Sequence, residues 1–242
     1  RWRPVELGVS IGNYSITAGS LGALCKKDGK VFAASNAHVV CWDPTDPNFQ
    51  YEKRIVQPGK ATGGLVPDDI IGEYAWHKPV LVLGWNGEGN PPPIPYDKIN
   101  YIDFAVYTPS VEHVATWADK SITPDSKFIG LLFAGGSDIG VIGKAKYMTA
   151  EGYDFGETTE VKMGDIVKGT SIWCNFETEV IDDSAALLVS YWSFYAAYDD
   201  CIFVQNKNDA EGKPRIKGGW SGSGWWKALV DTPPSPPAPD DE

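Results

Sequence analysis

Three residue types that together perform nucleophilic catalysis occur in this chain in the order histidine, aspartate, serine. His38 stands in "AASNAHVVC", Asp103 in "NYIDFAVY" and Ser221 in "GGWSGSG". A serine nucleophile needs a base that takes its proton and an acid that orients the base. Each motif alone is common in proteins without catalytic activity. Together, in a compatible order and each beside a strand-forming run, they predict one catalytic site.

The turn around Ser221 would expose its hydroxyl and complete the site. The backbone N–H groups of Gly219 and Ser221 are expected to point toward one place and to stabilise an oxyanion. Ser223 is the alternative nucleophile, although we expect it to hydrogen-bond within the turn. His77 in "YAWHKPV" and His113 in "VEHVATW" stand in no such context, so we expect them to be structural or exposed.

Composition predicts that β-strands position these residues. Of the residues, 43% are hydrophobic and 22% charged, and the chain holds Trp 10, Tyr 11, Phe 9, Gly 26 and Pro 18. Runs of about four to eight strand-forming residues are bounded by Gly, Pro, Asn or Asp, which is typical of an all-β sandwich or barrel. "GALCKK" and "KVFAASN" flank an Asp-Gly pair, which predicts a hairpin before His38.

The charge of the chain excludes several classes of partner. The formal net charge is −11, so duplex nucleic acid and anionic membranes would be repelled. No stretch approaches the ~20 apolar residues of a membrane helix. No Cys-x-x-Cys pair suggests a metal site, and we expect no cofactor. The chain begins at Arg1 without a signal-peptide pattern, as expected of a processed or trimmed chain.

Several motifs resemble those of trypsin-like (chymotrypsin-fold) serine peptidases, above all bacterial, archaeal and viral members with "TAGTLG" and "SNNHV". "ITAGSLGALCKKDGKVFAASNAHVV" is similar to their first hairpin and histidine loop, and "RIVQPGKATGG" followed by "DDIIGEY" to the next segment. "IDFAVY" resembles the aspartate strand, and "KGGWSGSGWW" resembles "GGDSGSPVW". The resemblance covers roughly residues 8–230.

This resemblance implies two six-stranded antiparallel β-barrels. Residues 1–112 would form the barrel with the histidine and the aspartate, and residues 113–230 the barrel with the serine. It implies His38 as general base, Asp103 as its orienting carboxylate and Ser221 as nucleophile, with the amides of Gly219 and Ser221 as oxyanion donors. Residues 231–242 are a Pro-rich acidic tail that cannot build a core and that offers a route to self-assembly or particle association.

The four cysteines, Cys25, Cys41, Cys174 and Cys201, fit either two local disulfides or free buried thiols. A Cys25–Cys41 bridge would close the histidine loop, as in many trypsin-like enzymes. Cys174 and Cys201 flank two runs that could pair in the second barrel. Two disulfides would imply an oxidising compartment, and so an extracellular, particle-associated or cell-surface location.

The chain also departs from the family pattern. Trp220 stands before the serine where the family usually has Asp, so the loop is either remodelled but active or has a broken oxyanion hole. A run like the one at residues 128–148 follows the serine in many relatives. Here it precedes the serine, so we expect a permuted second barrel; the alternative is an ordinary strand pair in an incomplete barrel. "VKGTSIW" replaces a family "GRTTG" turn. Arg215, six residues before the serine, would either make a basic specificity pocket or face solvent.

The function predicted from these residues is a serine endopeptidase that hydrolyses peptide bonds in a protein or peptide substrate. The alternative is a catalytically impaired protein of the same fold that serves as a structural component of a virion, sheath or cell surface. A weaker alternative is a glycan-binding β-domain that uses the tryptophans, most of which are better explained as core residues.

Overall fold

The Asp-Gly hairpin that the sequence predicts is present. In the computed structural model, strands β4 (Ala23–Lys27) and β5 (Lys30–Ser35) pair antiparallel. Asp28 and Gly29 between them have φ of +50° and +73°, which suits the two-residue turn that right-twisted strands favour. The hairpin leads directly into the short helix α1 (Ala37–Val40), which carries His38.

The structure describes most of the chain, with short gaps. The described residues are 3–16, 18–117, 122, 125–171, 175–191, 193–209 and 211–228. The expected tail at residues 231–242 and Cys174 therefore lie outside the described residues. In the described part, no helix is both long and apolar enough to cross a membrane.

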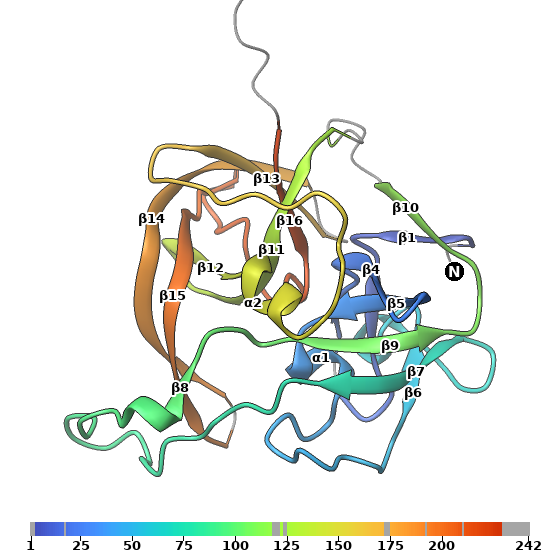
Figure 1. Ribbon diagram of the computed structural model, residues 1–242, viewed down its shortest axis with the longest axis horizontal. Coiled ribbons are helices and arrows are strands. Elements are labelled where there is room, and N and C mark those ends of the chain that lie inside the picture. Colours follow the sequence, from blue (N-terminus) through green and yellow to red (C-terminus); the bar gives the residue numbers. More distant parts are fainter. Residues whose placement is uncertain are drawn as a thin grey trace, which may run out of the picture.

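Seven strands from the first half of the chain form one curled antiparallel sheet, in the order β3-β2-β6-β7-β9-β5-β4 (Figure 1). Besides the hairpin, its members are β2 (Ser10–Asn13), β3 (Gly19–Ser20), β6 (Arg54–Val56), β7 (Ile70–His77) and β9 (Ala105–Pro109). Its interior is apolar: Ile11, Ile55, Ile71 and Val106 are fully buried. Burial of such side chains is the main favourable term that holds the curled sheet together.

Seven strands form a second sheet, and six of them close into a ring. Its members are β8 (Ile99–Asn100), β11 (Lys127–Gly135), β12 (Ile139–Lys144), β13 (Ile166–Thr170), β14 (Asn175–Ser190), β15 (Tyr195–Gln205) and β16 (Gly224–Lys227). The order is β12-β11-β16-β13-β14-β15-β8, and β12 also pairs with β15. The β12–β15 pairing closes the ring, while β8 adds to the other end of β15.

The expected all-β fold with two barrel-like sheets is confirmed. The hairpin of β11 and β12 completes the second ring through β16 and β15, so the barrel is not left incomplete. Two of the pairings between named strands are parallel in the described part of the chain. One joins β8 to β15, and the other joins β1 (Val5–Leu7) to β10 (His113–Trp117) in a separate two-stranded sheet.

Strand β11 lies between the two cores and contributes to both. Phe128 and Leu131 join the apolar core of the first barrel, whereas Ile129 and Leu132 belong to the core of the second. Both faces of the strand are therefore buried, which explains its nearly continuous apolar run "FIGLLF". The nearby strand β16 also contributes to both cores, through Trp226 and Trp225. The two barrels are thus joined along β11 and β16. Of these strands, β16 begins directly after the serine turn.

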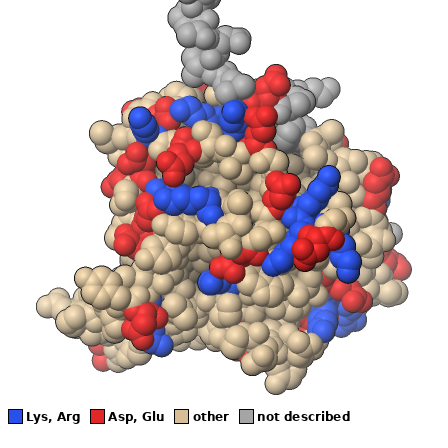
Figure 2. Space-filling model, in the orientation of Figure 1, with Lys and Arg blue, Asp and Glu red and all other residues tan. Residues whose placement is uncertain are grey.

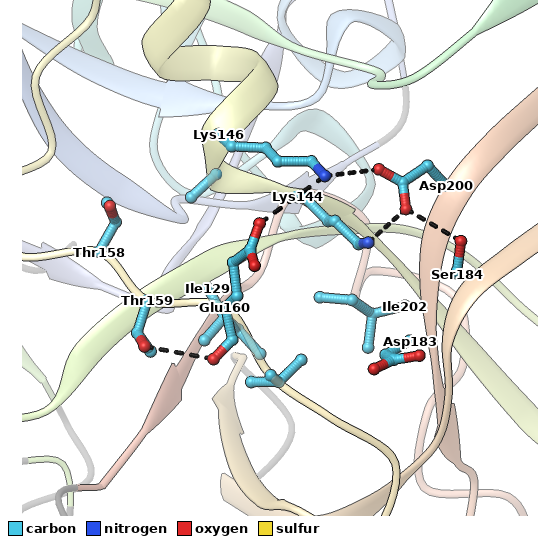
Figure 3. Close-up of a pocket in the computed structure, with 12 residues that line it drawn as sticks. Ile129, Lys144, Lys146, Thr158, Thr159, Glu160, Asp183, Ser184, Asp200 and Ile202 are labelled. Carbon is cyan, nitrogen blue, oxygen red and sulfur yellow. Dashed lines mark hydrogen bonds and ion pairs between the residues drawn. The ribbon is translucent and has the colours of Figure 1, made fainter.

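Charged side chains hold the short helix α2 (Ala145–Ala150) to strand β15. Figure 3 shows Lys144 and Lys146 pointing at Asp200 from one side of a cavity of about 420 Å³. Tyr147 Oη also donates to Asp200 Oδ2 at 2.5 Å. On the face shown in Figure 2, acidic and basic side chains lie close to one another and do not form separate patches. Because the lysines of this cavity are already paired, we interpret the cluster as structural.

Asp200 should contribute stability that depends on pH. Burial raises its pKa, but the hydrogen bonds from Lys144, Lys146 and Tyr147 outweigh burial and lower the pKa overall. A lowered pKa means that the contribution is complete above the ordinary value of about 4 and is lost as the pH falls below it. We expect Asp200→Asn to reduce the free energy of unfolding by about 1–2 kcal/mol at pH 7 and by less at pH 3. Asp183→Asn, in the same cavity, is the control; equal losses in both variants at both pH values would contradict this role.

The predicted Cys25–Cys41 disulfide is wrong. Cys25, Cys41 and Cys201 are buried free thiols. The two cysteines make separate contacts: Cys25 Sγ lies 3.8 Å from the carbonyl of Phe32, and Cys41 Sγ donates to the carbonyl of Asp43 at 3.1 Å. Cys201 is also free, and its predicted partner lies outside the described residues. The expected extracellular, particle or cell-surface location therefore stays a prediction that these thiols do not support.

These thiols should be unreactive until the protein unfolds. Burial raises the pKa of all three to about 12, and the thiolate is the reactive form. In a Cys174→Ser variant without reductant, we expect slow modification by an aromatic disulfide reagent at pH 8. In guanidinium, three thiols per chain should react rapidly. Detection of a single reactive thiol after unfolding would instead indicate a Cys25–Cys41 bridge.

Candidate active site

His38 and Asp103 form a close pair inside the first barrel. His38 lies on α1, immediately after β5, and Asp103 lies two residues before β9, which pairs with β5. His38 Nδ1 is 2.5 Å from Asp103 Oδ2. Asn36 Nδ2 also donates to the backbone carbonyl of Asp103 at 2.8 Å. The pairing of β5 with β9 therefore brings together two residues that are far apart in the sequence.

The Asp103 carboxylate is removed from solvent and saturated with hydrogen-bond donors. Its side chain has no exposed surface, and that of His38 is 24% exposed. Oδ1 accepts the backbone N–H groups of Ala37 at 2.5 Å and of His38 at 3.3 Å. Oδ2 accepts the Tyr191 hydroxyl at 2.8 Å in addition to His38 Nδ1. Each carboxylate oxygen thus has two donors, as a buried charge requires.

These donors keep Asp103 ionised. Burial by itself would raise the pKa of the carboxyl, but the nearby His38, its hydrogen bond, and those from Tyr191 and the Ala37 amide together lower it. An ionised carboxylate has no hydrogen to donate, so the hydrogen of the contact between Asp103 and the ring lies on His38 Nδ1. In the neutral ring Nε2 is then unprotonated, and it is the nitrogen able to act as a base.

The turn that carries Ser221 packs against the histidine segment through glycine. The Ser20 N–H donates to the carbonyl of Ser221 at 2.7 Å, and Ser20 Oγ donates to the carbonyl of Gly219 at 2.8 Å. A Cβ on Gly19 would lie 2.6 Å from the Ser221 carbonyl oxygen and 2.4 Å from Val39, the residue after His38. Only glycine at this position lets the serine turn approach α1 so closely.

Gly222 makes a second close contact between the barrels. Its φ is +84°, and a Cβ there would lie 1.9 Å from Ser35 Oγ and 2.5 Å from the carbonyl oxygen of Ser20. Both the backbone angle and the lack of space exclude other residues. Gly222 of "SGSG" and Gly19 of "TAGS" therefore have the same structural role. Both allow the serine turn to pack closely against the segment that leads to and includes His38.

His38 and Ser221 border the same cavity, which measures about 480 Å³. Most of its lining is apolar and comes from β11, β12 and the end of β14, including Phe133, Ile139 and Leu187. A second cavity of about 450 Å³ also borders His38; it is lined in part by Ile16, Trp42, Pro44 and Phe194. His38 and Tyr191 border both cavities. The histidine is thus flanked by two largely apolar hollows.

The two backbone amides expected to bind an oxyanion have no partner within the described part of the chain. The other amides of the turn are occupied: Trp220 N–H donates to Lys217, Gly222 N–H to Leu132 and Ser223 N–H to Trp220. The N–H groups of Gly219 and Ser221 donate to no acceptor among the described residues. Both amides are therefore available as donors, and their role in binding an oxyanion stays a prediction.

The side chain of Trp220 points away from the cavity and into the core of the second barrel. It is fully buried, with its ring centroid 6.4 Å from that of Phe176 and 6.0 Å from that of Trp225. Its Nε1 has no hydrogen-bond partner among the described residues. The serine turn is therefore held by aromatic packing and backbone hydrogen bonds in place of a buried acidic side chain.

The remaining predicted residues are placed as follows. Ser223 is fully buried, and its Oγ accepts Trp225 Nε1 at 3.2 Å, so its side chain bonds strand β16 instead of a residue within the turn. Arg215 lies over the Phe176 ring, with its guanidinium carbon 5.4 Å from the centroid. Arg215 is absent from the described lining of both cavities beside His38. Its role in specificity stays a prediction.

Ile216, which follows Arg215, packs beside two glycines, one on β11 and one on β12. The sequence alone does not predict this contact. A Cβ on Gly135 would lie 2.8 Å from Ile216, and one on Gly140 would lie 2.4 Å from it. Asn206 fixes this arrangement, since its side chain bonds the backbone of Ile216 at both N–H and C=O and also the carbonyl of Gly136. The segment before the serine turn is therefore packed tightly against β11 and β12.

The other two histidines belong to separate buried contacts. His77 Nδ1 meets the Tyr74 hydroxyl at 2.8 Å, and His113 Nε2 meets the Tyr107 hydroxyl at 2.8 Å. Burial lowers the pKa of both histidines, so both are neutral at pH 7. Their structural role agrees with the expectation from sequence.

Sequence reasoning missed Tyr191, the fourth donor to Asp103. The residue follows β14, in "LLVSYWSFY", and is one of 11 tyrosines. Nothing in that local pattern distinguishes it from a core aromatic residue. No protein-family model matches this chain, and no curated protein matches it at a significant level. The assignment of the site therefore depends on the geometry described above.

Trp220 should determine the stability of the second barrel. Trp220→Ala removes a fully buried indole, so we expect the free energy of unfolding to fall by about 3–5 kcal/mol. Trp220→Phe should cost less, because Nε1 gives up no hydrogen bond. Trp220→Asp, which introduces the residue usual in the peptidases that the sequence resembles, should cost at least as much as Ala because the carboxylate would lie unpaired among aromatic rings.

Urea unfolding followed by circular dichroism measures these differences. Trp42→Ala is the matched control, because Trp42 is 56% exposed and should change stability by only about 0.5 kcal/mol. A Trp220→Asp variant as stable as the parent would show that the turn is not held by packing of the indole.

Proposed function

We propose that the protein is a serine endopeptidase of the trypsin-like (chymotrypsin-fold) class, with Ser221 as nucleophile, His38 as general base and Asp103 as orienting carboxylate. One observation carries the proposal: His38, held by the buried and fully hydrogen-bonded Asp103 carboxylate, borders the same cavity as Ser221. In the serine turn, two backbone amides have no acceptor among the described residues. The curled double-sheet fold is compatible with this class, and the motifs around all three residues resemble it.

Each group would have a distinct part in the reaction. As the Ser221 hydroxyl oxygen attacks the peptide carbonyl carbon, its proton passes to His38 Nε2. Asp103 holds Nδ1–H and stabilises the imidazolium that forms. The negative charge on the carbonyl oxygen would be bound by the amides of Gly219 and Ser221. His38 then gives the proton to the leaving amine, and water releases the acyl group by the same steps.

The surroundings of the cavity favour an extended peptide as substrate. The pairing of β11 with β16 ends at Leu131, whereas its pairing with β12 continues to Gly135. Leu132 bonds the serine turn itself, donating to Ser223 and accepting from Gly222. Only the end of β11 beyond Leu132 therefore has a neighbour on one side alone among the described residues. An extended chain could add there by backbone hydrogen bonds, and its side chains would enter the apolar hollows on either side of His38. The proposed partner is thus a protein or peptide, and the chemistry requires no cofactor.

The unused amides distinguish this proposal from its alternative. A catalytically impaired structural protein of the same fold has no need of a buried carboxylate that holds a histidine, nor of two amides without acceptors among the described residues. The indole of Trp220 also lies in the barrel core and does not enter the cavity. The substitution before the serine is therefore compatible with an intact site.

Modification by a fluorophosphonate, which reacts with an activated serine, tests the proposal. We expect the parent protein to be labelled at Ser221, as located by peptide mass spectrometry. Ser221→Ala should abolish labelling, and His38→Ala should slow it by about 100- to 10,000-fold because the base is lost.

The matched control is Ser190→Ala. Ser190 is an exposed serine that lines the same cavity, but its Oγ donates to the Tyr191 carbonyl, so its loss should leave labelling unchanged. Absence of labelling in a parent protein with normal circular dichroism and cooperative unfolding would contradict the proposal. That result would favour the impaired structural protein.

A further inference from the structure

Three of the four donors to the Asp103 carboxylate come from the helix that carries His38, and the fourth comes from the other barrel. Ala37 N–H, His38 N–H and His38 Nδ1 all belong to α1. The fourth is the Tyr191 hydroxyl, which follows strand β14 of the second sheet and reaches Oδ2 at 2.8 Å. This is the same oxygen that contacts the imidazole, so the tyrosine acts on the atom that orients the base.

The Tyr191 hydroxyl is itself held in place from two directions. Its oxygen lies 2.7 Å from the hydroxyl of Tyr198. Because a carboxylate can only accept, Tyr191 donates to Asp103 and therefore accepts from Tyr198. The Tyr191 ring stacks on the Phe194 ring, with centroids 4.6 Å apart and planes inclined by 20°. The backbone N–H of Tyr191 also donates to the Phe194 carbonyl at 2.8 Å. Tyr198 is buried and packs against Phe133 of β11.

Two further features fit a function in the site rather than in the core alone. The Tyr191 ring meets the His38 imidazole edge to face, with centroids 5.7 Å apart, and it borders both hollows beside that histidine. Burial, followed by the charge of Asp103, raises the pKa of Tyr191 well above its ordinary value. The hydroxyl therefore keeps its proton and remains a donor throughout the pH range in which the site would work.

We propose that Tyr191 is a positioning residue, whose hydroxyl holds the Asp103 carboxylate in the orientation in which Oδ2 meets His38 Nδ1. The proposal rests on the proposed function. It makes the orientation of the base depend on the second barrel, through a chain of contacts from Phe133 to Tyr198, Tyr191 and Asp103. A hydrogen bond to a buried charge is among the stronger ones in proteins, and its loss leaves one carboxylate oxygen with a single donor.

Tyr191→Phe removes the hydroxyl and keeps the ring. The first measurement is the NMR resonance of the His38 Nδ1 proton, which reports on the contact with Asp103 whether or not the protein is active. We expect this resonance to move or to broaden through faster exchange with water. The second measurement is the pH profile of fluorophosphonate labelling at Ser221. The rate should fall by about 10-fold, and the acidic limb should shift to higher pH because Asp103 presents more concentrated negative charge to the ring.

Two variants make the test specific. Tyr107→Phe is the matched control: it also removes a fully buried hydroxyl that meets a histidine, His113, but it does not contact Asp103. It should leave both readouts unchanged. Tyr198→Phe removes only the support of Tyr191, so it should shift the His38 resonance in the same direction by a smaller amount. It also keeps the test available if Tyr191→Phe does not fold.

The outcomes separate the two proposals. An unchanged resonance and labelling profile in Tyr191→Phe, or changes no larger than those in Tyr107→Phe, would overturn the positioning role. If neither the parent nor any variant is labelled but the resonance moves in Tyr191→Phe and not in Tyr107→Phe, the proposed peptidase function fails while the positioning of Asp103 by Tyr191 is supported.

Discussion

The burial of one carboxylate constrains the rest of the site. Asp103 has no contact with solvent, and a charge in such a place is tolerated only when donors surround it. Those donors are the first turn of α1, the His38 ring and the Tyr191 hydroxyl. They come from both barrels, so neither barrel can move relative to the other without leaving the carboxylate short of a partner. The position of the His38 ring therefore depends on residues of both barrels.

Glycine imposes the complementary constraint at the serine. Gly19 and Gly222 have no space for a Cβ, because the backbone of the serine turn lies against Val39, Ser35 and Ser20. Ser20 then fastens the turn through hydrogen bonds to the carbonyls on either side of Trp220. The Asp103 carboxylate holds the His38 ring, and the close approach at Gly19 and Gly222 brings Ser221 to the cavity that His38 borders. Two independent sets of contacts thus converge on one place.

Much of this arrangement could be predicted from sequence because its signals are local. The Asp28-Gly29 turn, the strand runs and the order of His38, Asp103 and Ser221 each depend on short motifs. The Tyr191–Asp103 bond could not be predicted, since it joins residues 88 positions apart and depends on how β14 curls. The prediction of a Cys25–Cys41 disulfide was wrong for a related reason. Two cysteines near each end of the chain suggest two bridges, but the sequence does not reveal the directions in which their side chains point. The direction of the Trp220 side chain was open for the same reason.

The burial of Trp220 also has an evolutionary consequence. In a protein whose turn residues face solvent, the conformation of a turn can vary under selection independently of the packing of the core. Here the residue before Ser221 belongs to the core of the second barrel, packed on Phe176 and Trp225. A change that retunes the turn also repacks the barrel, so the two properties cannot drift apart one substitution at a time. Descendants of this chain would therefore change the turn and its aromatic neighbours together or retain both.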